Sequence, residues 1–172
     1  AIDSAKMYTN LMERYKYGGV DKPGIYLDES VMRMAGTHRR MFSILVKQLL
    51  AEGKKDKALK ALQYCNEMIP AYNVPHSHQT GSLDLAQSWV EIGQKEEASN
   101  IYNEMAVNAS QYCTYFLSLD DYHLAGSNFR YYLSILNECV ECLKIIDNEK
   151  SKIFDAQLQA ILQGYQVRAG GA

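Results

Sequence analysis

Apolar residues at helical spacing dominate the chain between residues 28 and 70. After Asp28, a residue type that caps helix N-termini, mostly apolar positions recur every three or four residues for about five turns. These positions are Val31, Met34, His38, Met41, Phe42, Leu45 and Leu49. Gly53 and polar residues 54–57 interrupt the pattern, and a second stripe then runs from Ala58 to Pro70. The pattern predicts a helical hairpin over residues 28–70.

The same pattern recurs over residues 80–110. Apolar positions lead to Gly93, a polar corner follows at residues 94–97, and a second apolar stripe begins at Ala98. Gly53 and Gly93 lie 40 residues apart, and so do Ala58 and Ala98, and also Leu62 and Tyr102. Three coincidences at one offset indicate an internal repeat, so we predict a second hairpin over residues 80–110.

The residues of both hairpins resemble the tetratricopeptide repeat, which alternates large and small apolar residues at fixed positions. The first copy carries Phe42, Leu45, Val46, Leu49, Gly53, Ala58, Leu62 and Pro70 at these positions. The second carries Ser82, Leu85, Ala86, Trp89, Gly93, Ala98, Tyr102 and Ser110. Val46, Ser82 and Ser110 depart from the pattern, and loop residues 71–80 account for the period of 40 rather than about 34.

The sequence also predicts helices at both ends of the chain. We predict an entry helix from Asp3 to Tyr17 and a Gly/Pro linker, which together occupy residues 1–27. A degenerate closing helix pair is predicted over residues 124–167, because terminal repeats depart from consensus. The predicted fold is a single all-α domain, residues 1–172, of stacked antiparallel hairpins in a tetratricopeptide-like superhelix.

Composition narrows the possible functions. Eighteen basic and twenty acidic residues leave a net charge of −2, which supplies no positive field for nucleic acid. No apolar run is long enough to insert directly into a membrane. The start at Ala1 lacks an initiator methionine and a signal core, so we interpret the chain as a piece of a longer protein, with a processed product as the alternative.

Three groups of residues could carry chemistry, and none favours an active site. His76 and His78 form an incomplete metal-ligand set, for which a solvated loop is the simpler interpretation. Cys139 and Cys142 form a C-x-x-C match in the middle of a predicted helix, where structural cysteines are expected. Asp120, Asp121 and His123 fit helix capping better than acid–base work. We therefore predict no catalytic residue, no metal and no cofactor.

Surface residues suited to a partner complete the set of candidates. Thirteen tyrosines are many for this length, and tyrosine anchors interfaces efficiently, although packing between hairpins is the simpler explanation. Arg39 and Arg40 are expected to face solvent or pair with acids. The candidate partner surface comprises Tyr17, Asp21, Tyr26, Arg39, Arg40, Tyr115 and Tyr122.

Several segments resemble a known bacterial family. They are residues 17–29, 32–34, 37–42, 69–75 and 115–120. Together they are similar to the C-terminal soluble region of large multi-pass membrane proteins whose N-terminal half looks like lipid-linked-sugar glycosyltransferases of the C-type class. The resemblance implies that catalytic residues of such a parent lie in its membrane half. It also implies an extracytoplasmic, periplasmic location for this region.

Three functions follow as hypotheses. The leading one is a non-catalytic interaction or scaffolding domain that binds a protein partner, a peptide or a glycan. The second is a purely structural domain that packs on its own membrane half. The third is a stand-alone enzyme that uses His76, His78 or His123 with nearby acids, which the incomplete ligand sets disfavour.

Overall fold

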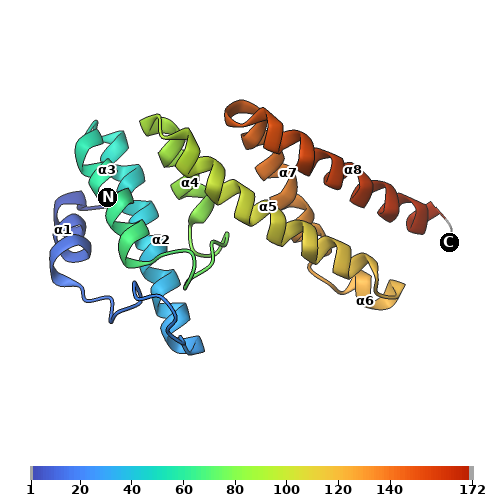
Figure 1. Cartoon of the computed structure of the whole chain (residues 1–172), viewed down its shortest axis with the longest axis horizontal. Coiled ribbons are helices and arrows are strands. Elements are labelled where there is room, and N and C mark those ends of the chain that lie inside the picture. The colour runs from blue at the N-terminus through green and yellow to red at the C-terminus, as the bar shows by residue number, and fades with distance from the viewer. Residues whose placement is uncertain (1, 171–172) are drawn as a thin grey trace. The chain divides into compact units, whose positions relative to one another are not determined.

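The computed structural model describes residues 2–170 and consists of helices joined by turns and loops, with no strand in that range (Figure 1). The all-α prediction is therefore confirmed. By internal contacts the chain divides into two compact units, residues 1–98 and residues 99–172. The boundary falls inside one helix, α5, Lys95–Leu117.

The N-terminal helix of unit 1 is shorter than predicted. Helix α1, Ser4–Thr9, begins where the Asp3 carboxylate accepts a hydrogen bond from the Lys6 N–H, 2.9 Å away. A π-helical turn, η1, Asn10–Arg14, follows, and the backbone then becomes extended at Tyr15. The predicted helix to Tyr17 is wrong, because the Tyr17 hydroxyl donates to the Leu11 carbonyl at 2.7 Å and folds the chain back.

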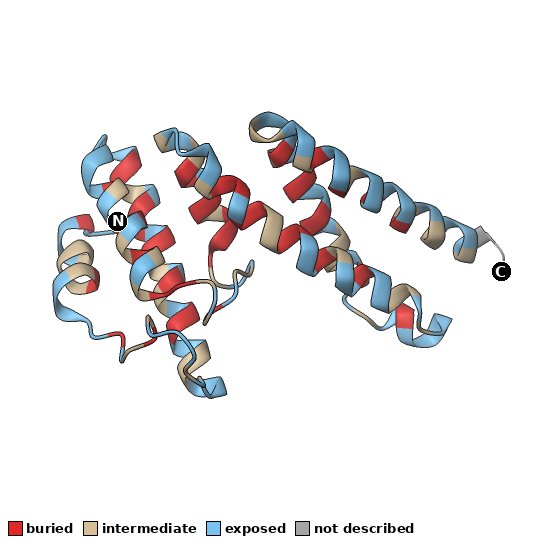
Figure 2. Cartoon of the chain, viewed as in Figure 1, coloured by how far each residue is buried: buried red, intermediate tan, exposed pale blue. Residues whose placement is uncertain are grey.

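Helices α2, Glu29–Ala51, and α3, Lys55–Met68, form the first hairpin. The Asp28 carboxylate caps α2 by accepting from the Val31 N–H at 2.9 Å, as the sequence indicates. Figure 2 shows buried residues along the helices of this unit, and on α2 they include Ala35, Phe42 and Leu49. Met34, which was expected within the apolar stripe, is instead 57% exposed. At this point of α2 the buried residues are instead Ala35 and Gly36, and a side chain on Gly36 would lie 2.8 Å from Thr80.

Helix α4, Ser82–Ile92, packs against α2 and α3. The corner after α4 repeats the corner after α2 bond for bond. Lys54 N–H donates to the Leu49 carbonyl at 2.8 Å, and Gln94 N–H donates to the Trp89 carbonyl at 2.9 Å. Gly53 and Gly93 both have positive φ, 73° and 93°, which glycine adopts readily. The 40-residue offset in the sequence is thus an offset between two equivalent helix ends.

Unit 2 consists of the greater part of α5, the short helix α6, Asp121–Ala125, and the helices α7, Phe129–Ile146, and α8, Asn148–Gly170. Helix α5 continues to Leu117, beyond the predicted hairpin end at residue 110, since no Gly or Pro interrupts it. Helices α7 and α8 pack closely, and Leu136, Val140 and Leu143 of α7 are fully buried. The Ser99 hydroxyl donates to the Asp147 carboxylate at 2.8 Å and joins α5 to the corner between α7 and α8.

The residues of the predicted repeat signature differ in burial. Their side chains are buried in both predicted hairpins, while the two corner glycines are exposed. The buried members are Phe42, Leu45, Leu49, Ala58, Leu62, Pro70, Leu85, Ala86, Trp89, Ala98 and Tyr102.

Candidate partner-binding groove

A groove with a volume of about 840 Å³ lies between α5 and α8 in unit 2. Its α5 wall includes Ser110 and Thr114, which share one helix face because they are four residues apart, and Ser118 lines it from the turn directly after α5. Its α8 wall includes Gln157 and Ala160. Of the described residues that line the groove, none is charged. The lining is therefore apolar surface with neutral hydroxyl and amide groups.

The hydroxyl groups of the α5 wall are held by local bonds. Thr114 Oγ1 donates to the Ser110 carbonyl at 2.9 Å, and Ser118 Oγ donates to the Tyr115 carbonyl at 2.6 Å. Such back-bonding uses the hydroxyl proton and leaves the oxygen lone pairs as acceptors. Ser110 Oγ donates across the groove to Gln157 Oε1 at 2.7 Å, which leaves the Gln157 amide nitrogen as a donor. The walls can therefore both accept and donate hydrogen bonds.

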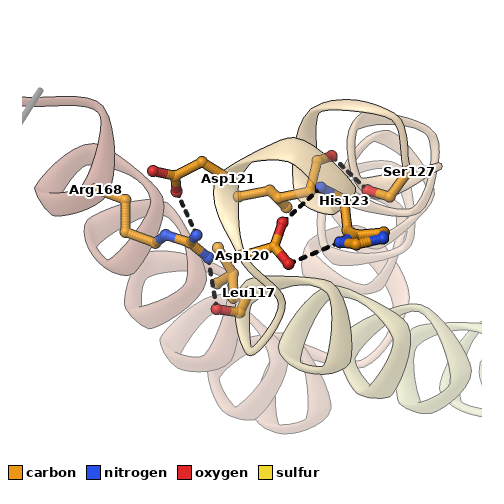
Figure 3. Close-up of polar contacts among 7 residues, drawn as sticks. Leu117, Asp120, Asp121, His123, Ser127 and Arg168 are labelled. Atoms are coloured by element: carbon orange, nitrogen blue, oxygen red, sulfur yellow. Dashed lines mark hydrogen bonds and ion pairs between the residues drawn. The ribbon is translucent and has the colours of Figure 1, made fainter.

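Arg168 of α8 connects the end of α5 to α6. Its guanidinium donates to the Leu117 carbonyl at 2.8 Å and forms an ion pair with Asp121 (Figure 3). Close to this bridge, a side chain built on Gly164 would contact Leu117 at 3.6 Å, so the two helices approach each other here. The Leu117 carbonyl lies at the C-terminal end of α5, where carbonyls lack helical partners, and Arg168 satisfies one of them.

The predicted partner-surface residues have different surroundings. Tyr115 lines the groove and is 58% exposed, and Tyr122 is also exposed. Tyr26 and Arg40 are exposed in unit 1, and Asp21 is half-buried there. Tyr17 and Arg39 are buried, so assigning them to a surface was wrong. Five of these seven residues belong to unit 1, and Tyr115 and Tyr122 belong to unit 2.

Arg39 is buried because its guanidinium binds the loop after α3. It donates to the carbonyls of Ile69, Val74 and Pro75 at 2.8, 2.6 and 3.0 Å. These carbonyls turn inward after α3 ends, and a planar fork of N–H donors can satisfy several of them at once. Arg39 thus organises the loop rather than a surface.

Tyr17 is part of an aromatic cluster. Its ring packs edge-on against His38 and Tyr64, with centroids 5.3 and 6.1 Å apart. Burial, with smaller contributions from Tyr64, Cys65 and Tyr15, raises the Tyr17 pKa, so the phenol stays neutral and donates to Leu11. Residues 17–29, the first of the segments that resemble the bacterial family, are therefore anchored in the core of unit 1 at Tyr17.

His76 is half-buried, contrary to the expected solvated loop, whereas His78 is exposed. His76 Nδ1 lies 2.8 Å from Ser82 Oγ, at the start of α4. Burial, and secondarily the charge of Arg39, lowers the His76 pKa to about 3. Although a serine and a histidine at this distance are a pattern typical of nucleophilic catalysis, Ser82 has no exposed surface. The pair therefore connects the loop to the helix start.

The remaining candidates have structural partners. Asp120 caps α6 by accepting from the His123 N–H at 2.9 Å, and its other oxygen lies 2.7 Å from His123 Nδ1 (Figure 3). These bonds from His123 lower the Asp120 pKa. Cys139 is buried in α7, and burial raises its pKa to about 12, while Cys142 is half-buried; both thiols are free. Among residues 2–170, no group of three or more His, Cys, Asp or Glu could hold a metal ion.

Of the residues that line the groove, the sequence predicts only Tyr115 as part of a binding surface. Ser110, Thr114 and Ser118 follow one another at four-residue spacing, which is typical of one helix face and is the signal that could have indicated the groove. In the described part of the chain, no helix is both long and apolar enough to cross a bilayer. No family model, curated protein or solved structure matches this chain.

Proposed function

We propose that this chain is a non-catalytic interaction module of tetratricopeptide-like hairpins, and that its α5–α8 groove holds an extended segment of a protein partner. The observation that carries the proposal is the composition of the groove. A wall of hydroxyl and amide groups over apolar surface matches a peptide, whose backbone offers one donor and one acceptor per residue.

The repeated helix corners support the tetratricopeptide-like part of the proposal. Gly53 and Gly93 end their helices with equivalent hydrogen bonds, and the alanines five residues later, Ala58 and Ala98, are both fully buried. Small residues at these positions let paired helices approach closely, and stacked hairpins are suited to long binding surfaces.

The resemblance to bacterial membrane glycosyltransferase-like proteins supports the cellular location that we propose for this function. In this location the module would be the periplasmic C-terminal part of such a parent and would bring a protein partner to it.

A matched pair of variants tests the groove. Ala160 lines it, whereas Ala156 is an exposed alanine of the same helix outside the lining. Linear peptides would be selected from a random phage-displayed library against the whole chain, and their affinities measured by calorimetry. We expect Ala160→Trp to weaken binding at least roughly tenfold, because the indole fills the groove, and Ala156→Trp to leave it unchanged.

Salt dependence gives a second criterion. Since the lining is uncharged, raising NaCl from about 0.1 to 0.5 M should change the peptide affinity by less than about twofold. Equal binding by the two tryptophan variants, failure to enrich any peptide, or saturable binding of a neutral oligosaccharide that displaces the peptides would each overturn the proposal. Circular dichroism of both variants checks that the fold is retained.

A further inference from the structure

Unit 2 contains a second pocket with different chemistry. It lies between α6, the start of α7 and the last turns of α8, and has a volume of about 480 Å³. That size is in the range of small-molecule sites, about 300–1,000 Å³. Its lining differs from that of the groove because it combines aromatic surface with charge.

The apolar part of the pocket is preformed. Phe129 is almost fully buried and stacks on Tyr165 of α8, with ring centroids 5.0 Å apart and an interplanar angle of 22°. Leu124 of α6 is also buried and lines the same pocket. An apolar or aromatic body of a ligand would meet packed surface that needs little rearrangement.

The charged part of the pocket is net positive. Arg130 and Arg168 line it together with one acid, Asp121. Arg168 is held in place by Asp121 and by the Leu117 carbonyl, as Figure 3 shows. The neighbouring acid, Asp120, binds His123 instead. Arg130 is exposed at the start of α7, next to Phe129 in the sequence, so a second cation flanks the apolar surface.

We propose that this pocket binds a small organic anion whose aromatic or apolar body packs on Phe129, Leu124 and Tyr165 and whose carboxylate or sulfonate binds Arg130 and Arg168. The guanidinium group suits this role because its planar N–H donors match the paired oxygens of such anions. The site goes beyond the proposed peptide-binding function and is independent of it.

The test uses 8-anilinonaphthalene-1-sulfonate, a fluorescent aromatic anion, with the whole chain. We expect saturable binding with one site per chain. Arg130→Gln should weaken it about tenfold, the usual effect of losing one charge-assisted hydrogen bond. The matched control is Arg33→Gln, which removes an exposed arginine of α2 that pairs with Glu29, and should leave the affinity unchanged.

Two further variants locate the site. Ala125→Trp should block the pocket while keeping both arginines, and Ala160→Trp, which fills the groove, should not affect the dye. Amide chemical-shift changes should concentrate at residues 121–130 and 165–169. Equal affinities of Arg130→Gln and Arg33→Gln, or shift changes mainly in residues 2–98, would overturn this site and leave the peptide groove unaffected. Thermal unfolding of each variant checks its fold.

Discussion

At the scale of single residues, two adjacent arginines have opposite environments. Arg39 is 1% exposed and binds three carbonyls of the loop after α3, whereas Arg40 is exposed. Successive residues of an α-helix point about 100° apart, so neighbours can face the core and the solvent respectively. No local sequence pattern distinguishes the two residues, because the carbonyls that Arg39 binds lie at positions 69–75, far away in the sequence.

Replacement of these arginines measures the difference. Arg39→Ala removes the donor from three carbonyls, and we expect the free energy of unfolding to fall by about 3 kcal/mol or more. Arg40→Ala should change it by less than about 0.5 kcal/mol, as is usual for surface substitutions. Urea unfolding followed by circular dichroism gives both values. Similar losses in the two variants would contradict the role assigned to Arg39.

His76 makes stability depend on pH. Its folded pKa of about 3 lies below the value near 6.5 of an unfolded chain. Between these values the unfolded state binds a proton that the folded state does not, so stability falls as pH decreases from about 6.5 towards 3.

In the upper part of this window Glu52 does not contribute, because its pKa is lowered to about 2 by hydrogen bonds from Lys54, Gln48 and Ser4 and its own loss of stability comes only at lower pH. Burial also lowers the pKa of His38, so that histidine contributes in the same window, and the His76 part is the difference between His76→Gln and the wild type. His76→Gln should lose less stability than the wild type between pH 6.5 and 5 in urea unfolding experiments. His78→Gln, at an exposed position of the same loop, should follow the wild-type profile. Parallel profiles for all three proteins would contradict this assignment.

At the scale of elements, the helices and their ends follow from local signals. Asp28 and Asp120 cap their helices, and Gly53 and Gly93 end theirs, because each interaction lies within a few residues in sequence. No local pattern in the sequence indicates why residue 81 is a glycine. A side chain there would lie 2.4 Å from Ser43 Oγ and 3.3 Å from the Arg40 Cα of α2, so its role depends on a helix about 40 residues away.

A comparison of two glycines separates the stability cost of backbone strain from the cost of a packing collision. Gly53 and Gly81 have similar φ, 73° and 77°, but a Cβ on Gly53 would meet no atom within 4 Å. Gly53→Ala should therefore cost about 1–2 kcal/mol, the strain of the left-handed region alone. Gly81→Ala adds the collision with α2 and should cost about 3 kcal/mol or more in the same urea assay. Equal costs would mean that α2 and the start of α4 are not in close contact.

The groove was beyond sequence prediction for the same reason as Gly81. Ser110 and Thr114 are recognisable as one face of α5, and Ser118 follows in the turn after it, but their role depends on which residues of α8 lie opposite. Those neighbours are set by tertiary contacts such as Ser110–Gln157 and Arg168–Leu117. Tyr115 was identified because tyrosine is itself an interface signal, whatever its neighbours in the fold.

At the scale of the whole molecule, the cysteines report on opening of both units. Cys65 of unit 1 and Cys113 and Cys139 of unit 2 are buried, and burial raises their pKa values to about 12, 11 and 12 respectively. Cys142 is half-buried. Thiolate formation and access both control thiol reactivity, so the buried three should react only when the protein unfolds.

A thiol reagent such as 5,5′-dithiobis(2-nitrobenzoate) tests this at pH 8. We expect one fast thiol per chain, which Cys142→Ser removes. Because α5 crosses the boundary between the units, we expect Cys65 and Cys113 to become reactive at the same rate, measured by mass spectrometry of alkylated peptides. Earlier labelling of Cys65 would show that unit 1 opens independently.

The linker of residues 15–28 has no helix or strand, yet side chains from far along the chain hold it. Asn73 Nδ2 donates to the carbonyls of Val20 and Lys22 at 2.6 and 2.8 Å, and the Tyr72 hydroxyl donates to the Asp21 carbonyl. For protein engineering, the consequence is that Asp28, the apparent start of the repeats, is an unsuitable place to begin a shortened version. Such a truncation would remove the acceptors of a loop more than 40 residues downstream, so the preceding segment should be retained as part of the folding unit.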